Sequence, residues 1–438
     1  MASPLRLPAR VRHGYGLGAL GFSVANTAIM FFILKYLVDG AGLSPAVAGT
    51  VLLVAKVWDA TIDPFIGRML DLKPAYRSWL GRATLPFAVV FAAIWWGLPI
   101  QGPFAPLVYC ALLMGYASAY SAGVVPYGAM TAALTPDYDE RTRLNSARMG
   151  WSMVGGIVAG VAMPLVMHAA SWRAAGALLG ALSIVPLAIA VRATRGRLQP
   201  RPARIGTGAP WEVLGSRPFR RTVVLFACAW TTTSALSALV PFYAHHVLGH
   251  MEYLDRVYAV IQVSALVSVP LVARLALRAQ KHVAYAIGMA SFSAALVALA
   301  LLPAGNVPAV FVVCALVGPG VAAAHVLPWS MLPDAVEVDR VEAGRDRTGS
   351  FYGAMTFVEQ AATALALWML GMALEAGGYV EGAAVQGPSA ILTIRALVGP
   401  VSAVILGAAA VFALLRPPLT RADHARYVET LRRQVEAA

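Results

Sequence analysis

Charged side chains are scarce in this 438-residue chain. Asp, Glu, Lys and Arg make up 13% of it, about half of the roughly 25% that is usual in soluble domains. Hydrophobic residues make up 59%, and they are spread over the whole length rather than confined to one end. The composition therefore excludes an ordinary soluble protein. It predicts a polytopic membrane protein, in which Gly and Pro are also tolerated within the helices.

Cysteine is nearly absent, and so are the sequence motifs of most enzymes. Cys110, Cys228 and Cys314 lie in apolar runs, too far apart for a metal site, and we interpret them as small core residues. The chain has no phosphate-binding loop, nucleophile elbow, zinc-protease helix or dinucleotide-binding fingerprint. We expect no enzymatic activity and no cofactor. Without an ATP site, any active transport must draw on an ion gradient.

Acidic residues are few as well, with 21 Asp and Glu against 34 Lys and Arg and a net charge of +13. A basic balance can indicate a nucleic-acid partner, but here its distribution indicates membrane topology. With the N-terminus assigned to the cytoplasm, 29 of the 34 basic residues fall in cytoplasmic segments, as the positive-inside rule requires. We therefore expect a plasma (inner) membrane protein with both termini in the cytoplasm, surrounded by lipid and without a nucleic-acid partner.

Twelve apolar runs have the length of about 20 residues that a membrane helix needs. These runs predict an all-α membrane protein with twelve transmembrane helices. Their approximate limits are 14–38, 46–70, 83–100, 104–133, 145–169, 173–191, 221–245, 254–274, 282–302, 307–332, 348–374 and 390–415.

The longest polar stretch between the runs divides them six and six. We predict an N-terminal half over 1–191, a basic cytoplasmic linker over 192–220, a C-terminal half over 221–415 and a cytoplasmic tail over 416–438. The arginine-rich linker is expected to lie at anionic lipid headgroups. The polar tail is expected to be helical, and no chemistry is assigned to it.

The two halves carry a repeated motif. One run continues as Pro126-Tyr127-Gly128, then Pro136-Asp137 and a charged cluster, and another as Pro328-Trp329-Ser330, then Pro333-Asp334 and a second charged cluster. Each cluster ends Arg-Thr before the next run. Two six-helix parallel repeats are the arrangement of the major facilitator transporters, in which the substrate site lies near mid-membrane where the halves meet.

Two carboxylates interrupt the second apolar run, where each costs about 2.5–3.5 kcal/mol on insertion scales. Asp59 and Asp63 are four residues apart, so they share one helix face, and Lys56 precedes Asp59 by three. Such a pair with access to water can bind a small hard cation, Na⁺ for example, or carry a proton. We predict a cation-coupling site at Asp59 and Asp63. The alternative is a structural ion pair between Lys56 and Asp59, with Asp63 hydrogen-bonded near Pro64.

Other polar residues stand at helix ends or in the middle of a run. Asp71 with its basic loop, the Asp137–Arg141 cluster and Asp334 are expected to act as gating latches at the cytoplasmic face. Candidates for a substrate cavity are Glu359 and Gln360 in the eleventh run, Arg148 at the start of the fifth, and Tyr120, Trp329 and Thr356. Alternative roles remain open: a packed pair or an interfacial position for Glu359, a loop contact for Arg148, and simple packing for the aromatic residues.

These motifs resemble the glycoside–pentoside–hexuronide:cation symporters, the melibiose-permease branch of the major facilitator superfamily. The resemblance runs from about residue 14 to 375. It is carried by Trp58-Asp59-Ala60 with Asp63-Pro64, by Pro126-Tyr127-Gly128-Ala129 and the cluster after it, and by the run from Pro328 to Asp334. It implies that Asp59 and Asp63 contribute to the coupling-cation site, and that Tyr120, Arg148, Trp329 and Thr356 line a sugar pocket. It also implies alternating access by rocking of the two halves.

Three positions depart from the family pattern. Ala19 stands where the family has Asp, Val124 where it has a polar residue, and Gln360 where it has Lys. A site that has lost hydrogen-bonding groups holds hydroxyls poorly. Our leading hypothesis is cation- or proton-coupled symport of a small organic solute, nominally a sugar or glycoside, by a monomer. An amphipathic substrate such as a lysolipid or a drug-like compound is the alternative, and a membrane sensor that does not transport is the third.

Overall fold

The computed structural model describes residues 7–43, 45–97, 104–198, 204–205, 210–380 and 385–436. Contacts group the chain into two compact units. Unit 1 comprises Met1–Leu214, Val336–Phe357 and Tyr427–Ala438, and unit 2 comprises Gly215–Ala335 and Val358–Arg426. The last turns of one helix and the first turns of the next, on either side of residue 345, therefore belong with the N-terminal helices.

Unit 1 is built from six long helices followed by short segments. Their bounds are α1 Ala9–Lys35, continued by the π-helical turn η1 Tyr36–Gly40, α2 Pro45–Leu72, α3 Tyr76–Ile94, α4 Ala105–Leu134, α5 Tyr138–Ala169, α6 Trp172–Ala193, β1 Arg204–Ile205 and η3 Pro210–Gly215.

Unit 2 supplies the remaining helices, and three of them, α10, α11 and α14, extend into unit 1. Their bounds are α7 Arg217–Tyr243 with η4 Ala244–Leu248, η5 Met251–Tyr253, α8 Leu254–Ala279, α9 Lys281–Leu301, α10 Val307–Ala343, β2 Arg345–Asp346, α11 Thr348–Ala376, α12 Pro388–Ala396 with η6 Leu397–Val401 and α13 Ser402–Leu415, and α14 Arg421–Glu436. The helix α14 confirms the prediction of a helical tail.

Each of the twelve predicted runs forms a helix, which confirms the all-α prediction. Among the described residues, ten helices are long and apolar enough to cross a membrane. The helices α2 and α3 are not among the ten, and α2 carries Lys56, Asp59 and Asp63 in its middle. Large apolar side chains such as Leu53, Phe65 and Leu107 are more than half exposed on the helix surfaces. Such exposure suits lipid, which costs apolar surface nothing.

Two predicted helix limits are wrong at the charged ends of the repeats. The helix α10 does not end near residue 332 but continues through Pro328 and Pro333 to Ala343, because neighbouring groups satisfy the backbone that a proline frees in a buried membrane helix. The helix α5 begins at Tyr138 rather than near residue 145. Asp137 caps it by accepting a 2.6 Å hydrogen bond from the Glu140 amide, and this cap allows a polar first turn.

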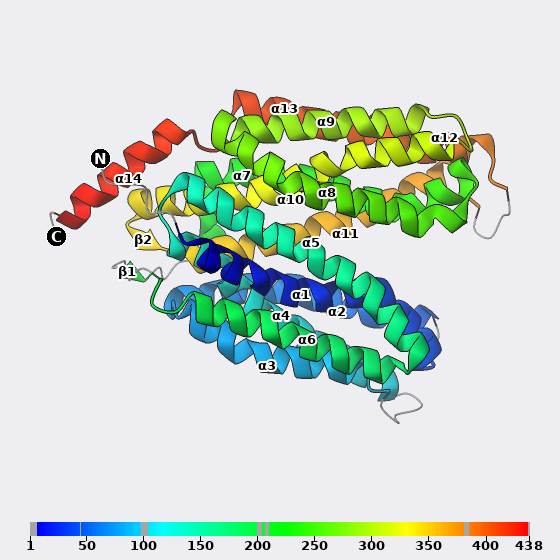
Figure 1. Cartoon of the computed structure of the whole chain (residues 1–438), viewed down its shortest axis with the longest axis horizontal. Coiled ribbons are helices and arrows are strands. Elements are labelled where there is room, and N and C mark those ends of the chain that lie inside the picture. The colour runs from blue at the N-terminus through cyan, green and yellow to red at the C-terminus, as the bar shows by residue number, and fades with distance from the viewer. Residues whose placement is uncertain are drawn as a thin grey trace. The chain divides into compact units, whose positions relative to one another are not determined.

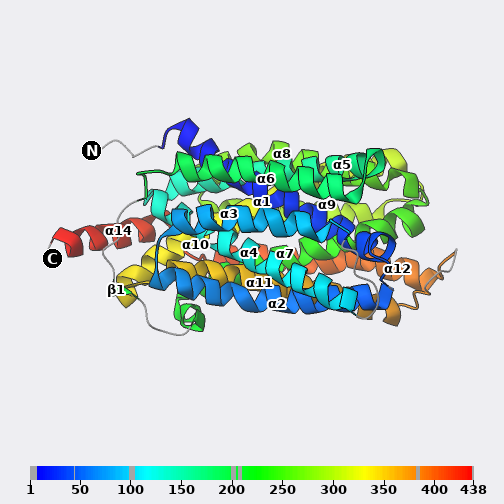
Figure 2. The ribbon, with the colours of Figure 1, turned by 90° about the horizontal axis from the view of Figure 1, so that it is seen from below.

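Within unit 1, α1 lies between α5 and α6, and α4 packs against both α2 and α3 (Figures 1 and 2). Small residues allow the close approach, since a Cβ atom on Gly155 of α5 would lie 2.7 Å from the Leu20 carbonyl oxygen of α1. The strands β1 and β2 form one short parallel pair that joins the segment before η3 to the turn between α10 and α11.

Within unit 2, α9 packs against α13 and α8, and α13 packs against α7 (Figure 1). Gly320 of α10 and Gly288 of α9 sit so close to neighbouring helices that an added Cβ would overlap Phe292 and Ala323. The start of α14 is tied to the turn between α8 and α9. The Arg421 guanidinium donates to the Leu277 carbonyl at 2.8 Å, and its amide donates to the Gln280 side chain at 3.3 Å.

Candidate functional site

Two carboxylates lie near the middle of α2, on the side that faces α4. Asp63 is 2% exposed and Asp59 is 9% exposed. The Ser121 hydroxyl of α4 donates a short hydrogen bond to Asp63 Oδ1. One turn earlier on α4, Ser118 Oγ accepts a 2.9 Å hydrogen bond from the Trp58 indole. The structure therefore brings both predicted acids into one buried, oxygen-rich region between two helices of unit 1.

Lys56 forms the ion pair that the structural alternative predicted. Its Nζ lies 3.1 Å from Asp59 Oδ2, and the lysine side chain is 49% exposed. Asp63 accepts a hydrogen bond from Ser121 on another helix, a contact that this alternative did not include. The pair neutralises one carboxylate locally. The coupling role of Asp59 and Asp63 stays a prediction.

Ser121 was not singled out from the sequence. Serine is common in membrane helices, and it becomes a candidate only when helix packing places it opposite an acid. The only signal in the sequence was its position, next to the candidate Tyr120 and three residues after Ser118. With two carboxylates and a hydroxyl, the region offers the oxygen ligands that hard cations prefer.

Asp71 lies at the last turn of α2 and binds the first turn of α11. Its carboxylate accepts hydrogen bonds from the Gly349 amide at 2.5 Å and the Ser350 amide at 2.9 Å, and from the Ser350 hydroxyl at 2.5 Å. These amides have no partner within their own helix, and the positive end of the helix dipole favours an acid there. Asp71 therefore caps α11 across the contact between the two helices.

Three glycines let α2 and α11 meet backbone to backbone beside that cap. A Cβ atom on either Gly67 or Gly349 would overlap the carbonyl oxygen of the other. One turn further along α11, a Cβ on Gly353 would lie 2.6 Å from the backbone oxygen of Asp63. Small residues four apart are the usual device for such crossings. The contact connects the start of α11 directly to the backbone of a predicted coupling residue.

A second predicted latch residue, Arg141 of α5, is fully buried. Its Nη2 lies 2.7 Å from Glu337 Oε1 of α10, and its Nε donates to the Thr135 carbonyl at 3.1 Å. Asp137 does not join this pair, because it caps α5. The partner Glu337 was missed because the sequence placed it outside a helix, whereas α10 continues through it.

The turn after α10 carries a further ion pair. Arg347 contacts Asp339 of α10 at 2.5 Å and Glu212 of η3 at 3.4 Å. Burial alone would lower the pKa of the Arg347 guanidinium. The hydrogen bonds with Asp339 and the nearby acids outweigh that effect, and its pKa lies above the usual value. Arg347 therefore stays charged and ties the linker segment to the end of α10.

In unit 2, Asp334 forms a buried ion pair within the helix bundle. The Lys281 ammonium of α9 lies 2.6 Å from Asp334 Oδ2 and also donates to the Ser330 carbonyl at 2.9 Å. His424 of α14 lies 3.9 Å from the other carboxylate oxygen. The two predicted latch residues Asp137 and Asp334 differ in their surroundings, because Asp137 caps α5 and Asp334 lies inside α10. Their gating role stays a prediction.

Three of the predicted substrate residues belong to unit 1. Tyr120 is half-buried among Phe22, Phe87 and Tyr116, with ring centroids 5.6–6.1 Å apart. Arg148 is 5% exposed, and its guanidinium passes beside Gly128 of α4.

Thr356 is half-buried on α11 and donates to the Gly353 carbonyl at 2.9 Å. Each of these three side chains makes packing or intrahelical contacts. Their role toward a substrate stays a prediction.

The other three belong to unit 2. Trp329 is 7% exposed and packs edge-on against Phe226 at 5.6 Å. Glu359 and Gln360 are half-buried on α11, and the Glu359 carbonyl accepts a 3.0 Å hydrogen bond from the Thr363 hydroxyl. The glutamate therefore shares a face of α11 with Thr363, one turn away.

Two of the positions that depart from the family pattern lie on α1 and α4. Ala19 is 7% exposed and Val124 is half-buried. Next to Ala19, a Cβ atom on Gly18 would lie 2.7 Å from the Tyr127 ring. The Tyr127 hydroxyl is satisfied by the Tyr15 carbonyl at 2.7 Å. The surroundings of Ala19 are thus closely packed and internally hydrogen-bonded.

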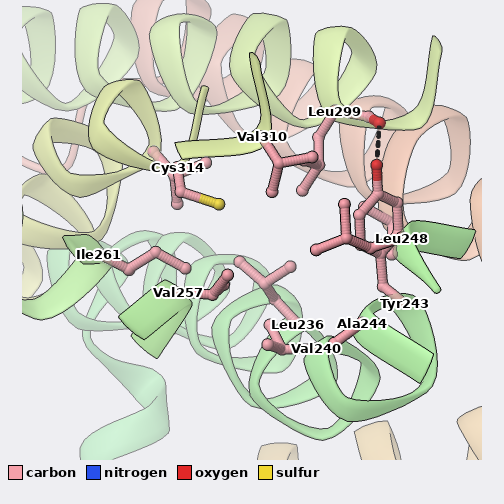
Figure 3. A pocket seen from close by; sticks show the side chains of 12 residues that line it. Leu236, Val240, Tyr243, Ala244, Leu248, Val257, Ile261, Leu299, Val310 and Cys314 are labelled. Atoms are coloured by element: carbon pink, nitrogen blue, oxygen red, sulfur yellow. Dashed lines mark hydrogen bonds between the residues drawn. The ribbon is translucent and has the colours of Figure 1, made fainter. Parts of the chain in front are cut away.

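An apolar crevice lies within unit 2 among α7, η4, α8, α9 and α10 (Figure 3). Its lining includes Leu236, Val257, Ile261 and Val310, and the Cys314 side chain faces it. Tyr243 turns its hydroxyl away from the crevice to donate to the Leu299 carbonyl at 2.8 Å. The cavity volume is about 10 Å³, which is barely enough for one water molecule. In this conformation the crevice has no room for an organic solute.

Comparison with known proteins identifies the family. Residues 14–421 match the MFS/sugar transport protein family. An uncharacterised symporter of Synechocystis is 26% identical, over 97% of this chain and 96% of the relative. The sodium-dependent lysophosphatidylcholine symporter 1-A of Danio rerio is 26% identical, over 90% and 83%. The glucuronide carrier protein homolog of Escherichia coli is 26% identical, over 87% and 86%.

Solved structures agree on the fold. A bacterial homologue of the iron transporter ferroportin, in its outward-facing state, has a TM-score of 0.70 at 15% identity over 92% of this chain and 98% of that one. The fucose:proton symporter of Escherichia coli has a TM-score of 0.67 at 14% identity, over 93% and 98%. The fold is thus that of the major facilitators. The chain belongs to the glycoside–pentoside–hexuronide:cation symporter family, and it is a membrane transporter and not an enzyme.

Proposed function

We propose that this protein couples the entry of Na⁺ or H⁺ to the transport of a small organic solute by alternating access. Asp59 and Asp63 hold the coupling cation. We place it in the plasma membrane as a monomer, with both termini in the cytoplasm, because the basic residues concentrate on that side in the sequence.

The buried pair of acids on α2 carries this proposal. Asp63 is 2% exposed and accepts a hydrogen bond from Ser121, and Asp59 lies 3.1 Å from the Lys56 ammonium. A membrane protein rarely retains such acids for stability alone, because apolar side chains of the same size pack more cheaply. A cation that binds here balances the charge of the carboxylates, and the Ser121 hydroxyl oxygen provides a further ligand for it. Binding then changes the charge of the very segment that contacts α11.

The contact between α2 and α11 supports a gating role for Asp71. Asp71 caps α11, and Gly353 lies against the backbone of Asp63. Movement of α11 away from α2 would break three hydrogen bonds to Asp71 and separate the three glycines. The buried ion pair of Arg141 and Glu337 adds a second contact, between α5 and α10. We assign Asp71, Asp137, Arg141 and Asp334 to the gates that close the cytoplasmic side of the transporter.

For the substrate we propose first a sugar or glycoside, contacted by Tyr120, Arg148, Trp329, Thr356, Glu359 and Gln360. The resemblance to a glucuronide carrier homolog supports this. The second candidate is an amphipathic molecule. It is supported by Ala19, Val124 and Gln360, which remove hydrogen-bonding groups, and by the similarity to a lysophosphatidylcholine symporter. A measurement of counterflow would also exclude the third reading, a sensor without transport.

Uptake into proteoliposomes tests the proposed function. A panel of sugars, glucuronides and lysolipids is offered with an inward Na⁺ gradient, an inward pH gradient or neither. We expect one gradient to drive accumulation of one class of compound. Asp59→Asn and Asp63→Asn should reduce that accumulation to the level without a gradient, because a neutral amide neither balances the charge of a bound cation nor takes up a proton.

The control is Glu252→Gln, which removes an acid whose side chain is 63% exposed in the turn before α8. This variant should keep wild-type uptake. Full gradient-driven uptake by Asp63→Asn would refute the coupling site. Protection by sugars alone in a thermal-shift competition would end the amphipathic alternative, and protection by lysolipids alone would end the sugar hypothesis.

A further inference from the structure

A polar cluster that the sequence did not single out lies at the middle of three helices of unit 2. The Trp230 indole of α7 donates to the Thr363 hydroxyl of α11 at 3.0 Å, and the Ser234 hydroxyl lies 3.3 Å from the same oxygen. The ring of His325 on α10 lies 5.0 Å from the Trp230 ring at an angle of 55°. All four side chains are half-buried. Their mutual contacts fix the two rings without enclosing them.

The hydrogen bonds of His325 define which nitrogen is open. Its Nδ1 lies 2.9 Å from the Val321 carbonyl. A carbonyl can only accept, so Nδ1 carries the hydrogen, and Nε2 of the neutral ring keeps a lone pair. Within residues 210–380 and the other described segments, nothing bonds to Nε2, and it is not an enclosed atom. His325 therefore offers a hydrogen-bond acceptor to whatever enters beside Trp230.

The charge around the cluster favours a donor. Glu359 lies one turn before Thr363 on the same face of α11. The sequence has no Lys or Arg over 222–243 of α7, 307–339 of α10 or 348–376 of α11. An incoming carboxylate or phosphate would therefore find no cation on these three stretches to balance its charge beside the lone pair of His325. A hydroxyl would find an acceptor and, beside it, the apolar face of an indole.

We propose that Trp230 and His325 form a recognition subsite for a hydroxyl group carried next to an apolar face of the substrate. His325 Nε2 accepts the hydrogen bond, and the indole covers the apolar face. The inference rests on the proposed function, because it assumes an organic solute. Both a sugar and the glycerol hydroxyl of a lysolipid have this chemistry, so the test must separate them.

Chemical labelling tests the subsite in the unaltered protein. Diethyl pyrocarbonate acylates an unprotonated imidazole nitrogen that is open to solvent, and mass spectrometry reads each of the eight histidines. The protein in lipid nanodiscs is labelled alone, with methyl glucoside, or with a short-chain lysophosphatidylcholine. The control ligand is that lysolipid with its free hydroxyl methylated. We expect His325 to be labelled and one probe to slow its labelling at least fivefold.

The exposed His245 should react at one rate throughout, and the methylated lysolipid should leave His325 unprotected. Protection by methyl glucoside assigns the subsite to a sugar, and protection by the lysolipid assigns it to a lipid head. The proposal is overturned if His325 resists the reagent, or if neither methyl glucoside nor the lysolipid slows its labelling relative to the protein alone. The assay needs no ion gradient. Absence of gradient-driven uptake would refute the proposed function alone.

Two variants give an independent readout by transport. His325→Leu removes the acceptor, whereas His325→Gln keeps an amide oxygen near its place. We expect His325→Leu to raise KM about tenfold while kcat and the dependence on the cation stay within twofold. His325→Gln should stay within threefold of wild type, and His245→Gln should match it. An unchanged KM in a folded His325→Leu would contradict the subsite.

Discussion

Each unit holds polar groups in the middle of its helices, and the two sets differ in kind. Unit 1 has acidic groups: Asp63 bonded by Ser121, and Asp59 paired with Lys56. Unit 2 has neutral hydrogen-bonding groups: Trp230 on Thr363, and His325 with an open nitrogen. The acids of unit 1 are at most 9% exposed, whereas the side chains of the unit 2 cluster are half-buried.

The difference points to a division of labour. Buried carboxylates respond strongly to a cation, because charge neutralisation in a medium of low dielectric is worth much more than in water. Neutral acceptors beside an aromatic face discriminate shape and hydroxyl position at modest energies. We therefore propose that the centre in unit 1 couples the ion, and that the centre in unit 2 contributes to solute recognition beside the contacts proposed for Tyr120, Arg148 and Thr356. The two functions are separable by mutation.

The largest expected effect comes from replacing a carboxylate by the corresponding amide, once in each unit. Asp63→Asn should reduce gradient-driven uptake at least 100-fold, whereas Glu359→Gln should change KM without removing the dependence on the gradient. The reason is that Asp63 is proposed to hold the exchangeable cation, whereas Glu359 is proposed to contact only the solute. Uptake at several gradients measures both. Equal loss of coupling in the two variants would erase the distinction between the units.

A smaller effect is expected where α11 meets the ionic centre. Gly353→Ala places a methyl group 2.6 Å from the Asp63 carbonyl oxygen, and forced contacts of this kind cost about 1–3 kcal/mol. Thermal unfolding in detergent should show this loss, and uptake should fall with it. Gly371→Ala on the same helix is the matched control, because nothing lies within 4 Å of its added methyl group. Identical behaviour of the two variants would show that the crossing is looser than described.

The hydrogen bonds made by the hydroxyl groups of the two centres should differ in strength. Ser121 bonds a carboxylate, and hydrogen bonds to charged groups contribute about 1.5–3 kcal/mol, against about 0.5–1.5 kcal/mol for neutral pairs. Ser121→Ala should therefore weaken activation by the coupling cation about tenfold. Thr363→Val, which removes the acceptor of the Trp230 indole, should raise KM only a few-fold. Cation titration of uptake and substrate titration separate the two, and the reverse order would contradict the assignment.

The smallest effect is expected at Lys56. Its side chain is 49% exposed, and exposed ion pairs contribute less than about 1 kcal/mol. Lys56→Met should shift the apparent affinity for the coupling cation less than fivefold, toward tighter binding, since a competing positive charge is removed. A complete loss of transport in a well-folded Lys56→Met would favour the structural interpretation of the pair.

Much of the fold could be predicted from hydropathy, because lipid imposes the same length and polarity on every span. The acids of α2 could be predicted for the same reason, since any charge in an apolar run is conspicuous. The end of α10 could not. Pro328 and Pro333 look like helix ends in the sequence, and only the surrounding helices make the continuous helix possible.

The partners of the predicted residues could not be found from the sequence. Ser121, Glu337 and Lys281 are ordinary residues until the rotation of each helix places them against Asp63, Arg141 and Asp334. The Trp230 cluster was missed for a related reason: tryptophan and threonine are neutral and attract no notice in an apolar run. Its only signal was His325, an isolated titratable residue in the middle of the tenth run.

Equilibrium binding of the transported solute, with and without the coupling cation, tests the central claim most directly. A cation that promotes transport must raise solute affinity by the factor by which the solute raises cation affinity. For the wild type we expect tighter binding with the cation, for Asp63→Asn one affinity under both conditions, and for His325→Leu a weaker affinity with the wild-type ratio. A cation-dependent affinity in Asp63→Asn, or a lost ratio in His325→Leu, would contradict the division between the two units.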